Sequence, residues 1–188
     1  MAGRTRSPAA TDWLDAAEPP VSNVLVLSSS LDATPTPASV SLGPADRPLV
    51  YVALTRRDLT LLDRWLAVTD SDRDVRLVDA TPGDHTPAPD LPGTDVAAPD
   101  ALTDLGVALS ETLAAAGRDP VCSFRSLTAL RQYVDRRRAY RFLNAAVDRT
   151  EAGAAVACYG VDPRALADRD VHAFASLFDA VHDRRAVE

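Results

Sequence analysis

Short polar segments follow several apolar runs of this sequence, and they hold the side chains best suited to chemistry. Serines follow the run 21–27, an aspartate follows the run 75–78, and Arg125 follows the run 120–124. Ligand sites of parallel sheets lie outside the carboxyl ends of their strands. Four of these side chains are therefore candidates for a small polar pocket, with a plain polar turn as the alternative: Ser29, Ser30, Asp32 and Asp79.

Several classes of catalyst are excluded by residue type. All 20 basic residues are arginine, so Schiff-base chemistry and a lysine general base are absent. The three histidines, His85, His172 and His182, have no metal-ligand spacing, and no serine lies in a GxSxG turn. Cys122 and Cys158 are the two cysteines, and we expect both to be reduced and buried. We therefore expect no metal and no cofactor.

Apolar runs alternate with amphipathic segments along the chain. The runs 21–27, 49–54, 75–78, 120–124 and 154–159 have the continuous apolar character of buried strands. Helical periodicity marks 58–68, 100–116 and 127–148, together with a segment from about Asp170. The alternation predicts an α/β fold with a mostly parallel sheet of about five or six strands and helices on both faces. We expect an irregular excursion at 80–99, and either helix or edge strand at 178–182.

The expected organisation is a loose lead at 1–20 followed by one domain at 21–188. Leu59, Leu62 and Leu66 form one stripe of the helix 58–68, with Asp58 as its expected N-terminal cap. No apolar run approaches the roughly 18 residues that a membrane span needs, so we expect no membrane association and a cytoplasmic protein.

The order of these elements resembles the RecA/KaiC-type P-loop ATPases, in particular short haloarchaeal members sometimes called transducer-like. The segments that carry the resemblance are VYVALT at 50–55 with its following helix, and VCSFRSLTAL at 121–130. The resemblance implies a RecA-like fold, with the strands that carry Cys122 and Cys158 side by side. In that family the first strand leads into a phosphate-binding loop, and a later strand ends in a metal-binding aspartate.

The residues that should bind phosphate and metal are missing. The loop glycines fall on Ser28 and Ala33, the lysine on Thr34, and the magnesium-binding hydroxyl on Pro35. The metal-binding carboxylate falls on Arg125, whose positive charge would repel a cation. Together these losses predict that the chain is not an enzyme and that it does not bind nucleotide. Arg125 could pair with Asp32 or Asp79 as a structural salt bridge.

Charge is distributed unevenly. The net charge is −7, with 23 of the 27 acidic residues being aspartate, as in proteins of salt-loving archaea. The segment 119–149 nevertheless carries seven arginines against three aspartates. We expect a docking surface on this helix, with a solvated face as the alternative. The candidate interface residues are Arg136, Arg137, Arg138, Tyr140 and Arg141.

Three functions are compatible with these patterns. The leading hypothesis is a non-catalytic RecA/KaiC-like module that binds a protein partner or a second copy of itself in signalling. The alternatives are a weak nucleotide-binding ATPase-like protein and a nucleic-acid-associated regulator that uses the arginine-rich helix. The negative net charge opposes the nucleic-acid alternative.

Overall fold

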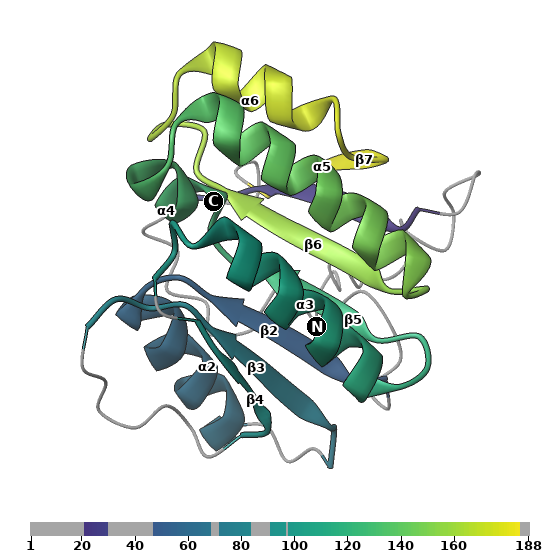
Figure 1. Cartoon of the computed structure of the whole chain (residues 1–188). Helices are drawn as coiled ribbons and strands as arrows, with labels where there is room; N and C mark the ends of the chain where they lie inside the picture. The colour runs from purple at the N-terminus through teal and green to yellow at the C-terminus, as the bar shows by residue number, and fades with distance from the viewer. Residues whose placement is uncertain (1–20, 30–46, 69–71, 84–90, 97, 185–188) are drawn as a thin grey trace, which may run out of the picture.

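Seven parallel strands form one sheet at the centre of the computed structural model, which describes residues 21–29, 47–68, 72–83, 91–96 and 98–184 (Figure 1). The sheet order is β4-β3-β2-β5-β6-β1-β7, and every pairing is parallel. The strands are β1 (Asn23–Leu27), β2 (Leu49–Ala53), β3 (Val75–Asp79), β4 (Gly93–Asp95), β5 (Val121–Phe124), β6 (Val156–Val161) and β7 (Ala180–Asp183).

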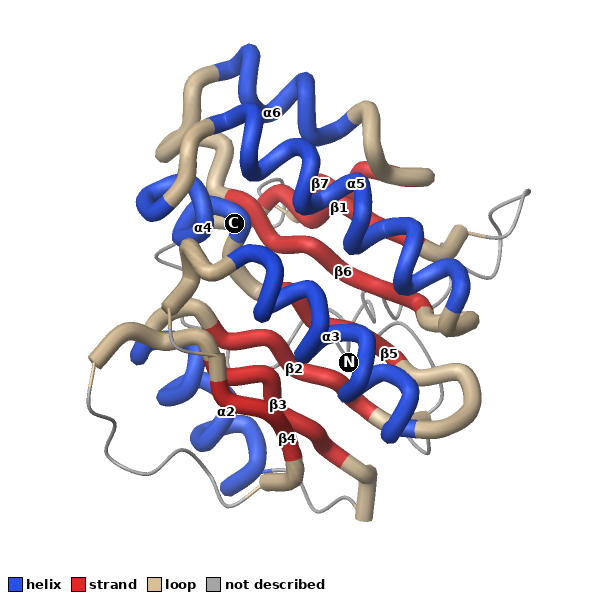
Figure 2. Tube along the Cα trace, in the orientation of Figure 1, coloured by secondary structure: helices blue, strands red, loops and turns tan. Residues whose placement is uncertain are grey.

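Helices cover both faces of the sheet, as the sequence predicts (Figure 2). The helix α2 lies on one face, and the four other described helices lie on the opposite face. The helices are α2 (Arg56–Val68), α3 (Leu102–Ala116), α4 (Leu127–Tyr133), α5 (Arg136–Ala152) and α6 (Asp168–Ala175). The predicted α/β class with a parallel sheet is confirmed.

Alternation along each central strand divides the core into two layers. In β2, Val50 and Val52 pack under the helices α3 to α6, whereas Tyr51 and Ala53 face α2. All five residues of β2 are buried because helices cover both sides of the sheet. This two-sided burial explains the continuous apolar runs in the sequence.

The two edges of the sheet extend it beyond the predicted five or six strands. The segment 80–99, expected to be irregular, contributes the edge strand β4, which pairs with β3. A β-carbon at Gly93 would lie 1.8 Å from the backbone oxygen of Leu77, so this close approach requires glycine. At the other edge, β7 resolves the choice at 178–182 in favour of a strand beside β1.

The single helix expected at 127–148 is two helices. Val134 is extended, with φ −132° and ψ 152°, and ends α4. The side chain of Asp135 then accepts a hydrogen bond of 2.9 Å from the backbone N–H of Arg138 and caps α5. The apolar stripe continues across the break, which is why periodicity alone does not reveal it.

The two cysteines lie on neighbouring strands, as the resemblance implies, but on opposite faces of the sheet. Cys158 of β6 is in register with Ser123 of β5, one residue beyond Cys122. Cys122 therefore packs under the helices α3 to α6, and Cys158 faces the α2 side. Both thiols are free and buried, and burial raises the pKa of Cys122 to about 12. This register excludes a disulfide between them without movement of the backbone.

None of the described helices is both long and apolar enough to cross a bilayer.

Candidate functional site

A cavity of about 410 Å³ lies at the carboxyl ends of β1, β5 and β6, beside the first turns of α2 and α4. Its size is within the range of small-molecule sites. Apolar residues form part of its wall, among them Val26, Leu61 and Ala129. Three arginines, Arg57, Arg125 and Arg184, also line it, together with the hydroxyl groups of Ser28, Ser29, Thr55, Ser126 and Thr128.

Arg125 and Asp58 form an ion pair at this cavity. The Nε atom of Arg125 lies 3.8 Å from Oδ1 of Asp58, and the two side chains are only 19% and 5% exposed. The pair joins the end of β5 to the first turn of α2. Sequence reasoning proposed Asp32 or Asp79 as the partner of Arg125. Among the described residues Arg125 pairs with Asp58 and not with Asp79, and Asp32 lies outside the described residues. Within the described residues, no three metal-ligating side chains come together here or elsewhere.

Asp58 is held by a reciprocal cap at the start of α2. Its Oδ2 atom accepts hydrogen bonds from the backbone N–H groups of Leu54 and Thr55, at 3.1 and 3.0 Å, and from the Thr55 hydroxyl at 2.9 Å. The Thr55 hydroxyl in turn accepts from the backbone N–H of Asp58 at 3.2 Å. This is a capping box. The helix therefore begins at Arg56 with Thr55 as its cap, and the expectation that Asp58 occupies the cap position is wrong by three residues.

Burial dominates the electrostatics of this cluster. Desolvation raises the pKa of Asp58, while the hydrogen bonds from Thr55 and Leu54 and the charge of Arg125 oppose the rise. The hydroxyl of Tyr51 donates to the backbone oxygen of Asp58 at 3.0 Å. Burial and the Asp58 carboxylate both raise the pKa of Tyr51, so this hydroxyl stays protonated and acts as a donor.

The strand β6 approaches Arg125 closely from the other side. A β-carbon at Gly160 would lie 2.2 Å from the backbone oxygen of Arg125, so the two backbones are in direct contact. Next to this contact, the Thr128 hydroxyl accepts from the backbone N–H of Asp162 at 2.8 Å. The side chain of Ser126 accepts from Ala129 N at 3.0 Å and caps α4. The backbone that carries Arg125 is therefore fixed between β6 and α4.

Only part of the predicted pocket lies at this cavity. Ser28 and Ser29 line it, and the backbone N–H of Ser28 donates to the Val161 oxygen at 3.0 Å. Asp79 does not line the cavity; its Oδ1 atom accepts from Thr81 N at 2.8 Å, and Oδ2 is buried with no hydrogen-bond partner among the described residues. The remaining predicted positions lie outside the described residues: Ser30, Asp32, Ala33, Thr34 and Pro35.

A family profile matches residues 21–183, a span that contains every described element from β1 to β7 and the whole cavity wall except Arg184. The profile is described as a family of unknown function, DUF7504. The chain belongs to the DUF7504 family. A search of the curated proteins found no match to it.

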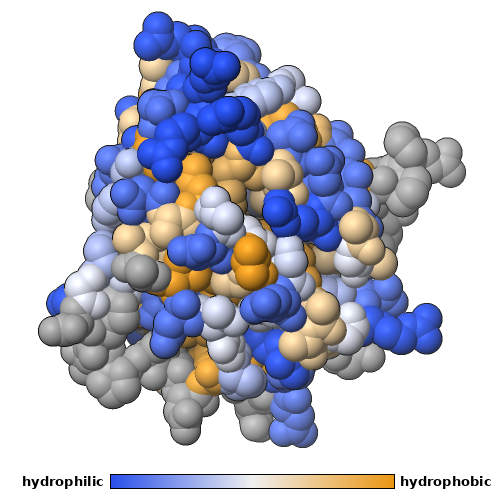
Figure 3. Space-filling model, viewed as in Figure 1, coloured by the Kyte–Doolittle hydropathy of each residue, from blue (hydrophilic) through white to orange (hydrophobic). Residues whose placement is uncertain are grey.

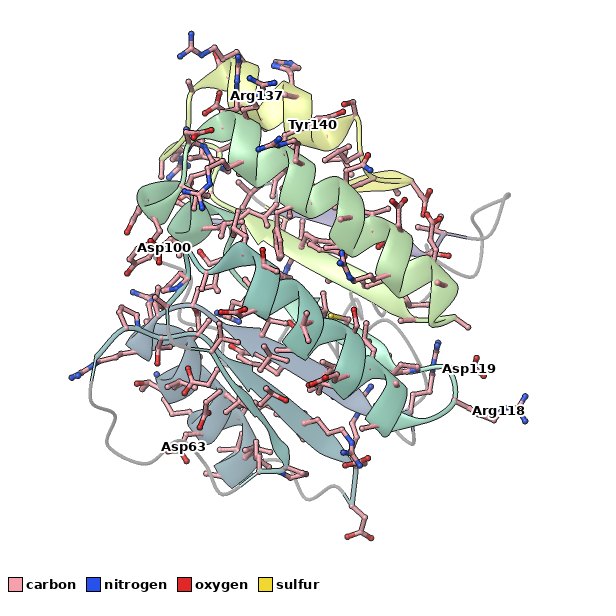
Figure 4. All side chains as sticks on the ribbon, in the orientation of Figure 1. Asp63, Asp100, Arg118, Asp119, Arg137 and Tyr140 are labelled. Carbon is pink, nitrogen blue, oxygen red and sulfur yellow. The ribbon has the colours of Figure 1, made fainter. Side chains whose placement is uncertain are left out.

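The arginine-rich helix of this DUF7504 chain divides into bound and exposed side chains. Arg136 lies 3.8 Å from Asp170 of α6, and Arg138 donates to the backbone oxygen of Asp100 at 3.2 Å. Arg137 and Arg141 are exposed, and Tyr140, 36% exposed, lies between them on the helix. Figure 4 shows Arg137 and Tyr140 on the outer side of α5, close to α6. All five predicted interface residues are exposed, and the interface itself stays a prediction.

Sequence reasoning missed the main polar partners in the DUF7504 site. The sequence predicts only a capping role for Asp58 and places Gly160 at a strand end without a contact to Arg125, and it gives no role to Thr128 or Arg184. The T-x-x-D pattern at 55–58 was an available signal for the capping box. The contact between Gly160 and Arg125 depends on the pairing of β5 with β6, and no local pattern encodes that pairing.

Proposed function

We propose that this DUF7504 chain is a non-catalytic RecA/KaiC-like domain that acts by binding another protein in the cytoplasm of a salt-loving organism. The observation that carries the proposal is the ion pair between Arg125 and Asp58 at the carboxyl end of β5. By the resemblance, this is the place of the metal-binding carboxylate. A guanidinium there opposes the approach of a magnesium ion.

The remaining chemistry of the site supports a binding role. Oδ2 of Asp58 already accepts three hydrogen bonds, and its Oδ1 atom faces Arg125, so this carboxylate serves the fold. No lysine exists in the chain to contact the β- and γ-phosphates of a nucleotide. Phosphoryl transfer relies on such cations and on a bound metal ion, so its main requirements are unmet.

The outer face of α5 supplies the surface for a protein partner. Arg137, Tyr140 and Arg141 follow one another at spacings of three and one, which places them on adjoining parts of the helix surface. Figure 3 shows strongly hydrophilic side chains gathered over the α5–α6 end of the molecule. Arginine and tyrosine are enriched at protein interfaces, because a guanidinium binds carboxylates bidentately and a tyrosine ring buries area at low entropic cost.

The double substitution Arg137→Asp with Arg141→Asp tests the binding role. It reverses two charges that make no contact with other described residues, so the fold should be kept. We expect the variant to lose the self-association or the captured partner of the wild type, measured by light scattering and by affinity capture in about 2 M KCl. The matched control reverses Arg64 of α2 and Arg118, which are both exposed and lie away from α5.

The binding surface would be refuted if the α5 variant folds, keeps the oligomeric mass of the wild type and captures the same proteins. Loss of the same interactions in the control would refute its location. The non-catalytic part has its own test, because MgATP should cause no upward shift of the unfolding temperature and no phosphate release. A ligand that binds the native state must stabilise it, so a clear shift with MgATP would overturn that part.

A further inference from the structure

We propose that the cavity at the carboxyl ends of β1, β5 and β6 binds a small organic carboxylate with an apolar body, held by the guanidinium of Arg125. The inference goes beyond the proposed function and does not depend on it, because a small-molecule site requires neither nucleotide chemistry nor a protein partner.

The hydrogen-bonding state of Arg125 is the first observation. A guanidinium has five N–H donors, and buried donors in proteins are normally hydrogen-bonded. The Arg125 side chain is only 19% exposed, yet its one close polar contact within the described residues is the 3.8 Å approach of Nε to Asp58. That approach is longer than a hydrogen bond. No hydrogen bond joins its donors to another described residue, and none of its nitrogens is a fully buried atom without a partner, so the guanidinium stays accessible to a ligand.

The orientation of Arg125 is the second observation. Nε is the Arg125 atom that approaches Asp58, and Arg125 forms part of the cavity wall, so its guanidinium lies within reach of a ligand there. The contact between Gly160 and the Arg125 backbone oxygen fixes the start of the side chain. A planar fork fixed at one edge of a cavity matches the geometry of a carboxylate, which accepts two parallel N–H bonds.

The net charge of the side chains that line the cavity indicates how many negative charges the ligand carries. Among the described lining residues the charged side chains are three arginines and two aspartates, Asp58 and Asp162, so this part of the wall has an excess of one positive charge. This excess balances one carboxylate. It does not balance the several negative charges of a nucleoside triphosphate, and the desolvation cost of a multiply charged ligand would not be repaid. The preferred ligand therefore has a single negative charge.

The apolar wall selects the body of the ligand. Val26, Leu61 and Ala129 line the cavity. Sites for small organic molecules combine an apolar wall with a few polar groups that fix orientation. Around Arg125 the hydroxyl groups of Ser126 and Thr128 are such groups. A short aliphatic or aromatic acid places its apolar body against the apolar residues and its carboxylate against the polar groups around Arg125.

The test uses three probes, butyrate, hexanoate and benzoate, with hexanamide and inorganic phosphate as comparisons. Binding is measured by calorimetry and by the shift of the unfolding temperature at constant KCl. We expect hexanoate or benzoate to bind saturably and to stabilise the fold, and hexanamide and phosphate to have no such effect. Backbone amide NMR signals of Ser126 and Gly160 should move with hexanoate, while that of Arg118 should not.

Arg125→Met should weaken carboxylate binding by at least about tenfold, since a charge-assisted hydrogen bond is lost. The matched control Arg118→Met removes the same charge from the loop before β5, at the opposite end of the strands, and should change affinity by less than about twofold (Figure 4). If Arg125→Met does not fold, Arg125→Lys keeps the charge and loses the planar fork, and should weaken binding several-fold.

Three results would overturn the inference: no carboxylate probe binds, hexanamide binds as well as hexanoate, or the Arg125 variants bind as tightly as the Arg118 control. Stabilisation by phosphate alone would identify an adventitious anion site and would also overturn it. The failure of the proposed function is distinguishable, because it would appear as stabilisation by MgATP or as an α5 variant with unchanged partners, whatever the carboxylates do.

Discussion

Asp58→Ala is the substitution that most directly tests how the site is built. The side chain accepts three hydrogen bonds at the start of α2 and faces Arg125 across 3.8 Å. Loss of a helix cap costs about 1 kcal/mol. Removing one partner of a buried ion pair costs about 3–5 kcal/mol, but Arg125 keeps 19% exposure and the desolvation of Asp58 offsets part of the gain. We therefore expect Asp58→Ala to lower the free energy of unfolding by about 2–3 kcal/mol.

Two further variants separate these contributions. Asp58→Asn retains a side-chain oxygen that can accept from Leu54 and Thr55, so it should lose mainly the ion pair, about 1–2 kcal/mol. Asp63→Ala removes an exposed carboxylate from the same helix and should change the stability by less than about 0.5 kcal/mol (Figure 4). The predicted order of destabilisation is therefore Asp58→Ala, then Asp58→Asn, then Asp63→Ala.

Urea unfolding at constant KCl measures these changes, followed by the fluorescence of the two tryptophans, one of which, Trp65, is buried on α2. A double-mutant cycle with Arg125→Met gives the coupling of the pair, which we expect to be about 1–2 kcal/mol. Equal destabilisation by Asp58→Ala and Asp63→Ala would refute the structural role of Asp58. Additivity of the Asp58 and Arg125 substitutions would refute the ion pair as a source of stability.

Two other expectations concern the strand contact and the surface charge. Gly160→Ala should destabilise the protein by about 1–3 kcal/mol or more, because its β-carbon would lie 2.2 Å from the Arg125 oxygen, whereas Gly106→Ala meets only the Arg149 guanidinium at 3.5 Å and should be neutral or stabilising. Equal urea midpoints for the two alanine variants would contradict the close contact. The unfolding temperature should rise from about 0.1 M to about 2 M KCl, because screening relieves repulsion within a chain of net charge −7. A midpoint independent of KCl would contradict the halophilic interpretation.

The sequence predicted the strands that are covered by helices on both faces of the sheet. The strands β1, β2, β3, β5 and β6 were each found within two residues at either end, because each is a continuous apolar run. The strand β4 was missed because Gly93, Thr94 and Asp95 have no apolar signal, and this strand is held by backbone bonding to β3. The break at Asp135 was missed because a cap is one side chain within an otherwise helical pattern.

The candidate site was less predictable than the fold because its contacts depend on strand order. Arg125 and Asp58 follow β5 and β2, which are distant in sequence and adjacent in the sheet. The same adjacency excludes Asp79, which is the last residue of β3, on the far side of β2. A sequence pattern places each residue at the end of its own strand, but only the order of the strands decides which ends meet.

The position of Arg125 links the two proposals made for this chain. In the resemblance, phosphate would be bound by backbone N–H groups of a glycine loop and by a lysine, and this sequence has proline and no lysine at those places. Arg125 restores a positive charge at the same edge of the sheet, on a side chain paired with Asp58 and a backbone packed against Gly160. A single fixed guanidinium recognises one oxyanion group and has no means of activating a phosphoryl group. The arrangement that argues against phosphoryl transfer is therefore the one that favours binding of a carboxylate.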